Sequence, residues 1–170
     1  MSDIITSTLN DDDKNSWSTD PRVFDAIDNE FNFGLDAAAS NDNHKCETYM
    51  TKDQNALMMD WSFNSESVWV NPPYGRGMIK PFMQKAIEQK AKGVTSVLLV
   101  PATMEAKWLP INKVSEIRII TGGRLSFYHP ITKKIVAGNT KGSMLVIFRP
   151  SSMPCFLRMV DRDELLGVKP

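Results

Sequence analysis

The tetrapeptide Asn71-Pro72-Pro73-Tyr74 combines groups that can hold a planar amine. Its prolines lack backbone N–H donors and fix φ, so the segment is stiff and its carbonyls are free to accept hydrogen bonds. Asn71 adds a side-chain carbonyl and Tyr74 a flat aromatic face. Two acceptors beside a stacking surface suit adenine, cytosine, guanine or a carboxamide, and would make such a poor amine nucleophile able to attack an electrophilic methyl group. The alternative is a strand-terminating turn, because Asn, Pro and Tyr are ordinary turn residues.

The residues around the tetrapeptide favour a site over a simple turn. Ser67–Val70 precedes it and is typical of a short strand, and Gly75 and Gly77 follow it and allow close backbone approach. Asp36 similarly follows Phe31–Leu35, whose apolar residues alternate as in a strand. In open α/β sheets, ligands bind beyond the carboxyl ends of the strands, which is where both polar groups are expected.

The elements that would position these groups alternate between strands and helices. Helices are predicted at about Pro21–Asn29, from Ile79 to just before Gly93, and around Met104–Val114. Strands are predicted at Phe31–Leu35, Cys46–Thr51, Ser67–Val70, Val94–Val100 and Glu116–Thr121. Leu125–Tyr128 and Met144–Phe148 are expected to pair around the loop His129–Gly142, after a turn at Gly122-Gly123. This order predicts an α/β fold with a mostly parallel sheet, a C-terminal antiparallel hairpin and helices on both faces.

Length and composition indicate one folded domain. The chain has 170 residues, 42% of them apolar, which is enough for a self-sufficient core. We expect a disordered tail at 1–16, the domain at 17–150, and a tail at 151–170 that docks on the core or pairs with another subunit. Lys plus Arg and Asp plus Glu are both 20, which excludes nucleic-acid binding by overall basicity but not by a local basic face. Acidic residues concentrate before Ile79 and basic residues after it.

Several protein classes are disfavoured by the sequence. No apolar stretch approaches the roughly 20 residues that span a bilayer, and the acidic segment Met1–Asn15 does not resemble a signal peptide. Cys46 and Cys155 fit no disulfide framework or CxxC site, and the chain has only two histidines. We therefore expect a cytoplasmic protein of a reducing compartment, with no metal and no membrane partner.

The tetrapeptide resembles the (Asp/Asn/Ser)-Pro-Pro-(Tyr/Phe) motif of amino-methyltransferases that use S-adenosylmethionine. These enzymes act on adenine N6, cytosine N4, RNA guanine N2 or protein glutamine. Further segments resemble one family, the small Dam-type DNA N-6-adenine-methyltransferases of phages and prophages. They are Thr19–Phe24, Phe33–Ala39, Asp60-Trp61, Val68–Gly75, Leu99–Ala102 and Gly123–Phe127. The likeness covers about Trp17–Pro150 and implies a Rossmann-like methyltransferase fold in the cytoplasm of a bacterial host, in DNA protection, restriction-modification or regulation.

The resemblance implies methylation of adenine N6 in DNA at a short site, for which GATC is the usual guess. Asn71 and the Pro72 carbonyl would accept from the amine, with Pro73 stiffening the segment and Tyr74 stacking on a flipped base. The residues expected at the cofactor are Trp17, Thr19, Asp36, Ala37, Ala38 and Asp60, with Asp53 as an alternative to Asp60. Asp36 could instead cap a helix. The sequence departs from the family pattern twice: Asp36–Ala39 replaces a glycine-rich turn, and Asp20 stands where a proline is expected.

Cations of the second half are expected to contact double-stranded DNA. They are Arg124, Lys133, Lys134, Lys141 and Arg149, with the loop His129–Gly142 entering a groove or touching phosphates. The lysines of the helix after the tetrapeptide, Lys80, Lys85, Lys90 and Lys92, are expected to form a solvated face. We expect a monomer or weak homodimer with little room for a separate recognition domain. The alternatives are methylation of another planar amine and a non-catalytic nucleic-acid-binding module.

Overall fold

The structure, a computed structural model, describes residues 17–136, 140–151 and 155–169. The expected tail at 1–16 lies outside these residues. The first half contains β1 (Ser18–Thr19), α2 (Pro21–Phe31), β2 (Leu35–Ala39), β3 (Tyr49–Thr51), the 3-10 helix η1 (Trp61–Phe63) and β4 (Ser67–Val70). The second half contains α3 (Ile79–Ala91), β5 (Thr95–Pro101), β6 (Glu116–Thr121), β7 (Phe127–Tyr128), β8 (Ser143–Phe148), β9 (Phe156–Asp161) and α4 (Arg162–Leu165).

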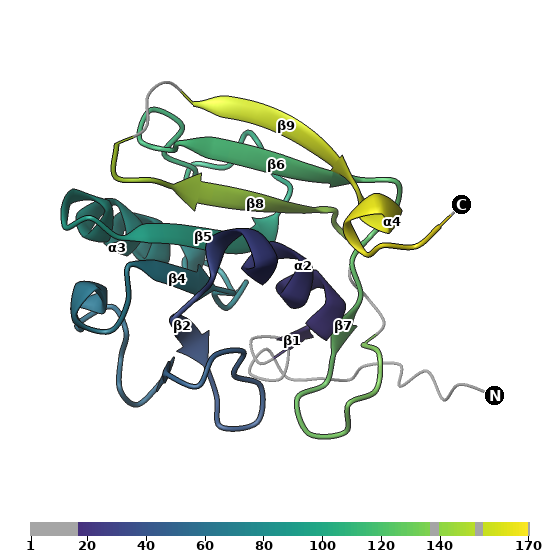
Figure 1. Cartoon of the computed structure of the whole chain (residues 1–170), viewed down its shortest axis with the longest axis horizontal. Coiled ribbons are helices and arrows are strands. Elements are labelled where there is room, and N and C mark those ends of the chain that lie inside the picture. Colours follow the sequence, from purple (N-terminus) through teal and green to yellow (C-terminus); the bar gives the residue numbers. More distant parts are fainter. Residues whose placement is uncertain (1–16, 137–139, 152–154, 170) are drawn as a thin grey trace.

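Seven strands form one mixed sheet in the order β3-β2-β4-β5-β8-β6-β9 (Figure 1). Strands β3, β2, β4 and β5 are parallel, and β9 runs parallel to β6. Strand β8 is antiparallel to both of its neighbours, β5 and β6. The carboxyl ends of β2, β4, β5 and β6 therefore share one edge of the sheet. The predicted α/β class, with a mostly parallel sheet, is confirmed.

One helix covers each face of the sheet. Helix α3 packs Ile79, Met83 and Ala86 with the residues of β5 that face it, Leu98 and Val100. Helix α2 packs Val23, Phe24 and Ile27 on the opposite face, where the β5 residues are Val97 and Leu99. Because β5 is covered on both sides, its sequence is a continuous apolar run instead of an alternating one.

Helix α2 is capped at both ends, by a side chain at its start and by a left-handed residue at its end. The Asp20 carboxylate accepts from the Arg22 backbone N–H at 2.9 Å and pairs with its guanidinium at 2.8 Å. Pro21 occupies the first turn, where the missing N–H needs no partner. Asn32, with φ of 50°, ends the helix in the left-handed conformation. Asp20 is thus a helix cap at the position where the family resemblance leads us to expect a proline.

The predicted strand at Phe31–Leu35 is wrong. Helix α2 extends to Phe31, and the strand is Leu35–Ala39, so Asp36 lies inside β2. The alternating apolar residues serve aromatic packing instead, since the rings of Phe31 and Phe33 stack with centroids 5.6 Å apart. The small residues after Asp36 continue the strand between β3 and β4, so the alternative of Asp36 as a helix cap is also wrong.

Two other elements differ from expectation. Residues around Met104–Val114 form turns and no helix, because Pro110 interrupts the apolar spacing on which that prediction rested. The predicted pairing of Leu125–Tyr128 with Met144–Phe148 is wrong as well. Strand β8 is buried along its whole length and fits between β5 and β6, whereas β7 pairs antiparallel with β1 in a separate two-stranded sheet.

The C-terminal segment adds the last strand to the sheet. Strand β9 pairs with β6 from Glu116 opposite Phe156 to Thr121 opposite Asp161. The turn after β6 passes close to this strand: a Cβ atom at Gly122 would meet the Asp161 carboxylate, and Gly122 has φ of 75°. Part of the segment 151–170, expected as a tail, therefore lies along the edge of the sheet.

Candidate active site

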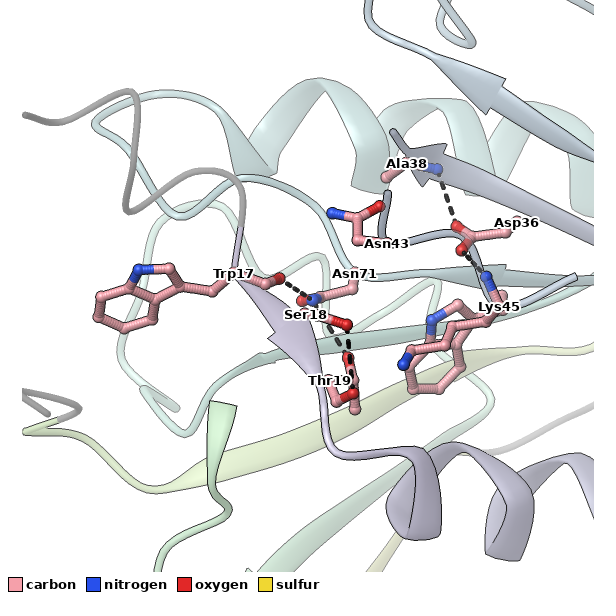
Figure 2. Close-up of a pocket in the computed structure, with 9 residues that line it drawn as sticks. Trp17, Ser18, Thr19, Asp36, Ala38, Asn43, Lys45 and Asn71 are labelled. Atoms are coloured by element: carbon pink, nitrogen blue, oxygen red, sulfur yellow. Dashed lines mark hydrogen bonds between the residues drawn. The ribbon is translucent and has the colours of Figure 1, made fainter. Parts of the chain in front are cut away.

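A pocket opens where β1 crosses the carboxyl ends of β2 and β4 (Figure 2). Its lining residues are Trp17, Ser18, Thr19, Asp36, Ala38, Asn43, Lys45, Trp69 and Asn71. The open space is about 190 Å³. This space is continuous with the solvent, so the lining residues, and not its volume, indicate what the pocket could bind.

The Asn71 side chain has a defined orientation in this pocket. Its Nδ2 donates to the Trp17 backbone carbonyl at 3.3 Å and to Thr19 Oγ1 at 3.2 Å (Figure 2). Because a carbonyl can only accept, the amide nitrogen must face Trp17, which fixes which side of the amide carries the oxygen. Oδ1 is then the group of Asn71 that can accept a hydrogen bond from a ligand.

The N-terminal strand is held over the pocket by the hairpin that carries β7. Ser18 pairs with Tyr128 and Thr19 with Phe127. The Trp17 indole points away from Asn71 (Figure 2). It packs on Phe127, with ring centroids 6.2 Å apart. Trp17 therefore contributes its backbone carbonyl to the site, and Thr19 its side chain.

Tyr74 lies beside the pocket with its ring held at two points. The hydroxyl donates to the Leu99 backbone carbonyl at 3.1 Å, and the ring meets Phe127 edge-on with centroids 6.1 Å apart. Burial raises the pKa of Tyr74, so the phenol stays protonated at neutral pH. Pro72 is buried and Pro73 half-buried, so of the tetrapeptide only Asn71 lines the pocket.

Asp36 places a buried carboxylate in the pocket wall. It is 3% exposed, and its oxygens accept from the backbone N–H groups of Ala38 at 3.2 Å and Lys45 at 3.0 Å (Figure 2). Burial raises the pKa of Asp36 to about 6, against the lowering effect of these bonds and of nearby Lys45 and His44. Among the described residues, no cationic side chain forms an ion pair with it, so the site has an unneutralised negative group.

The structure separates the other expected cofactor residues. Ala38 lines the pocket, while Ala37 is buried in the core on the α3 face. Asp60 caps η1 and accepts from Lys92 Nζ at 2.6 Å, which holds the pKa of that carboxyl down at about 2. It lies near the end of α3, at the opposite edge of the sheet. Asp53 is exposed and follows β3, which ends at the same edge as β2.

Ser18, Asn43, Lys45 and Trp69 line the pocket but were not identified from the sequence. Asn43 and Lys45 belong to the loop Ser40–Lys45, in which Asn43 Oδ1 accepts from the Ser40 backbone N–H at 2.6 Å. Burial lowers the pKa of Lys45, and Asp36 partly opposes this shift. The sequence signal for this loop is the polar run Ser40–Lys45 directly after β2. It was missed because the strand was predicted to end at Leu35 instead of Ala39.

Four of the five cations expected to contact DNA lie at the edge of the sheet that holds Asn71. Arg124 follows the carboxyl end of β6, and Lys141 precedes the amino end of the antiparallel β8. Lys133 and Lys134 lie in the hairpin after β7, and Lys133 Nζ donates to the Asp42 backbone carbonyl at 2.8 Å. Topology alone therefore brings these cations to the pocket side of the molecule.

Arg149 and the lysines of α3 are placed differently. Arg149 lies at the opposite edge and pairs with Glu116 at 2.7 Å, beside the pair of Arg118 with Glu30 at 2.6 Å. Burial raises the pKa of Glu116, but the hydrogen bonds from both arginines outweigh it and the net shift is downward. Lys85 is buried against Glu88, Lys92 bonds Asp60, and Lys90 donates to the Lys113 carbonyl, so three of the four lysines hold the fold together.

Two further features bear on the class of protein. Within the described residues, the helices are all too short or too polar to cross a membrane. In the same part of the chain, the His, Cys, Asp and Glu side chains form no group of three that could hold a metal ion.

A mostly parallel seven-stranded sheet with a helix on each face and an antiparallel strand near its C-terminal end is a Rossmann-like methyltransferase fold. The sequence profile of the family described as DNA N-6-adenine-methyltransferase (Dam) matches residues 6–168. The chain therefore belongs to the DNA N-6-adenine-methyltransferase (Dam) family, which is a family of enzymes.

Two relatives carry the same description. The chain is 34% identical over 145 residues to the DNA N-6-adenine-methyltransferase of Haemophilus phage HP1 (strain HP1c1), with 82% of each protein covered. It is 34% identical over 150 residues to the DNA N-6-adenine-methyltransferase of Escherichia phage T1. That match covers 78% of this chain and 62% of the T1 protein, so the chain spans under two thirds of the T1 relative.

Proposed function

We propose that this protein transfers a methyl group from S-adenosylmethionine to the exocyclic N6 of adenine in double-stranded DNA, at a short site. Family membership supports the reaction, and the orientation of Asn71 is the observation that carries it. Since both partners of Nδ2 belong to the protein, Oδ1 is left to accept from the substrate amine. N6 is inaccessible inside a duplex, so the adenine must leave the stack to reach this oxygen.

In this mechanism, Asn71 Oδ1 and the Pro72 carbonyl accept the two N6 hydrogens. These bonds draw electron density onto the nitrogen and favour a pyramidal amine with an available lone pair. N6 then forms a bond to the methyl carbon as the carbon–sulfur bond breaks, and one N6 proton leaves to water. No side-chain base is needed, because the methylated amine is acidic enough to lose that proton unaided. The tetrapeptide is stiff, so its acceptors are already placed before the substrate arrives.

The residues of the pocket fit the amino-acid end of S-adenosylmethionine. When bound, this cofactor supplies an electrophilic sulfonium methyl group. Asp36 offers an unneutralised carboxylate for the ammonium group, and Asn43 and Lys45 offer donors for the carboxylate. Asp53, at the end of β3, is better placed than Asp60 for the ribose hydroxyls.

Cofactor affinity should depend on pH through Asp36. The carboxylate loses its charge as the pH falls through about 6, so affinity is expected to be constant above pH 7 and to fall about tenfold per pH unit below 6. Calorimetric titrations from pH 5 to 8, in buffers of different ionisation enthalpy, measure both the affinity and the proton released on binding near pH 6. Equal affinity at pH 5 and 8 would contradict the role of Asp36.

Tyr74 should act through its ring. Removal of the hydroxyl in Tyr74→Phe loses only the bond to the Leu99 carbonyl, so we expect a loss of about tenfold or less in methylation rate. Tyr74→Ala removes the stacking surface, worth about 1–3 kcal/mol per base, and should lose roughly tenfold more. Single-turnover rates on one duplex measure both. Equal losses in the two variants would show that the hydroxyl is the important group.

The DNA-facing surface is proposed to include Arg124, Lys134 and Lys141 at the edge of the sheet that holds the pocket. Phosphate contacts require only that Lys and Arg be locally placed, so a chain without net charge can still hold DNA along one edge. Sequence preference would come from the loops of this edge, and GATC is the first site to test.

The decisive experiment is product identification. The protein is incubated with S-adenosylmethionine labelled in its methyl group and with unmethylated duplex DNA, and the digested nucleosides are separated. Label on adenine N6, and its loss when the adenine of GATC is replaced, supports the proposal and the site. Label on cytosine N4, or only on added RNA or protein, would overturn it.

A further inference from the structure

The hairpin formed by Phe127–Val136 is bonded to both walls of the pocket. On one side, its strand β7 pairs with β1, which carries Thr19 to Asn71. On the other side, Lys133 Nζ donates to the Asp42 backbone carbonyl at 2.8 Å. Figure 1 shows this hairpin beside the loop that follows β2. The hairpin therefore connects two segments that are far apart in sequence.

The loop Ser40–Lys45, which receives the bond from Lys133, is itself part of the pocket. Asn43 and Lys45 line it, and the Lys45 backbone N–H donates to Asp36 Oδ2 at 3.0 Å. The loop is thus held at one end by Asp36 and near its middle by Lys133 and by the Tyr49 hydroxyl, which donates to Asn41 Oδ1 at 3.0 Å. Loss of any of these bonds would loosen residues that shape the pocket.

Lys133 adopts an unfavourable backbone conformation to make this contact. Its φ is 57°, and it is one of only three non-glycine residues with positive φ in the described part of the chain. The turn is closed by the Lys133 N–H to His129 carbonyl bond and the His129 N–H to Lys134 carbonyl bond, both 2.9 Å. Such conformations persist only where the surroundings determine them, so these two bonds fix the backbone of the turn from which the Lys133 side chain extends.

In this position, the Lys133 ammonium also acts on a residue that lines the pocket. The pKa of Lys45 is lowered first by burial, and the positive charge of Lys133 lowers it further.

We propose that Lys133 is a positioning residue that holds the loop Ser40–Lys45 against the hairpin, and that through this bond cofactor binding and DNA binding are coupled. The inference rests on the proposed function and changes the role of Lys133 from a phosphate contact to a bond within the protein. DNA bound on the hairpin would hold the loop in place and strengthen cofactor binding. By thermodynamic reciprocity, bound cofactor would strengthen DNA binding by the same factor.

Amide hydrogen exchange of the cofactor-free protein tests the positioning role directly. Lys133→Met should speed exchange of the backbone amides at 43–45 about threefold or more, while Lys134→Met, an equal charge change one residue away, should leave them unchanged. Lys133→Arg keeps a donor and should restore protection. Unchanged exchange in Lys133→Met would overturn the proposal, and this readout does not depend on which cofactor the protein uses.

Binding measurements test the coupling. Lys133→Met should weaken S-adenosylhomocysteine binding without DNA by about fivefold, the value of one net hydrogen bond, and Lys134→Met by less than about twofold. For a duplex, Lys134→Met should reduce the salt dependence of log affinity by about 0.9, the value for one lost phosphate contact, and Lys133→Met should not. In Lys133→Met, DNA should no longer change cofactor affinity. Equal cofactor affinity in both variants, with equal losses of salt dependence, would identify Lys133 as a phosphate contact and overturn the proposal.

Discussion

Asn71→Ala should abolish methyl transfer while the protein still folds and binds cofactor. The substitution removes the acceptor on which we propose the reaction depends, and loss of one preorganised hydrogen-bonding group costs roughly 10²–10³-fold in rate. The side chain contributes little to folding, because its two bonds of 3.2 and 3.3 Å lie in a half-buried pocket. Single-turnover methylation measures the rate, and calorimetry measures cofactor affinity, which should change less than about threefold.

Asn112→Ala is the matched control for this variant. Asn112 is exposed in the turn before β6, and the same substitution there should leave rate and stability unchanged. Thr19→Val separates orientation from chemistry: it removes one acceptor of Nδ2 but keeps Oδ1, so its rate should lie between those of wild type and Asn71→Ala. Loss of cofactor binding in a folded Asn71→Ala protein, or a rate near that of wild type, would contradict the role assigned to Asn71.

The tetrapeptide could be recognised from sequence because its chemistry is local. Prolines, a terminal amide and an aromatic ring are adjacent, and the strand and helix that flank them, β4 and α3, have clear patterns of their own. Strand β5 was equally clear as a continuous apolar run. In these elements propensity, periodicity and burial agree, and they place Asn71 at the carboxyl end of β4.

The errors concern partners that are distant in sequence. No local pattern indicates that β8 fits between β5 and β6, or that β7 pairs with a two-residue strand more than 100 residues earlier. The loop Ser40–Lys45 joins the pocket only because Asp36 accepts from the Lys45 N–H nine residues further on. The pocket is therefore assembled from segments that topology brings together. Asp36 and Asn71 could be identified as polar groups near strand ends, and Trp17, Thr19 and Ala38 by the family resemblance, whereas Asn43 and Lys45 could not.

Charge is arranged differently at the two edges of the sheet. At the edge opposite the pocket, Glu116 is buried but neutralised by Arg118 and Arg149, so its charge serves stability. At the pocket edge, Asp36 is equally buried without an ion pair among the described residues. A buried charge that lacks a partner lowers stability, and proteins keep such groups where function needs them. This contrast supports Asp36 as the cofactor ligand more strongly than its position in the sequence does.

Asp36→Asn should therefore weaken cofactor binding without weakening the fold. A charge-assisted bond to an ammonium group is worth about 1.5–3 kcal/mol, so the dissociation constant for S-adenosylmethionine should rise roughly 10- to 150-fold. The substitution also removes a buried charge whose pKa is raised from 3.8 to about 6, a cost of about 3 kcal/mol at neutral pH. Asparagine leaves one of the two backbone donors at Ala38 and Lys45 without an acceptor, which offsets part of that gain.

The pH dependence of stability distinguishes this explanation from a merely structural role. Because the folded pKa of Asp36 is raised, the free energy of unfolding of the cofactor-free protein should increase as the pH falls from 7 to 5. Five carboxyls have a lowered pKa: Asp20, Glu30, Asp60, Glu88 and Glu116. The stability that they contribute is lost mainly as the pH falls below their ordinary values of 3.8 to 4.5, so it changes little between pH 7 and 5. Urea titrations at pH 5, 6 and 7 should show the increase in wild type and not in Asp36→Asn. An Asp36→Asn protein with wild-type cofactor affinity would exclude Asp36 as the ligand for the ammonium group, and one with the wild-type pH dependence of stability would show that Asp36 does not have the raised pKa.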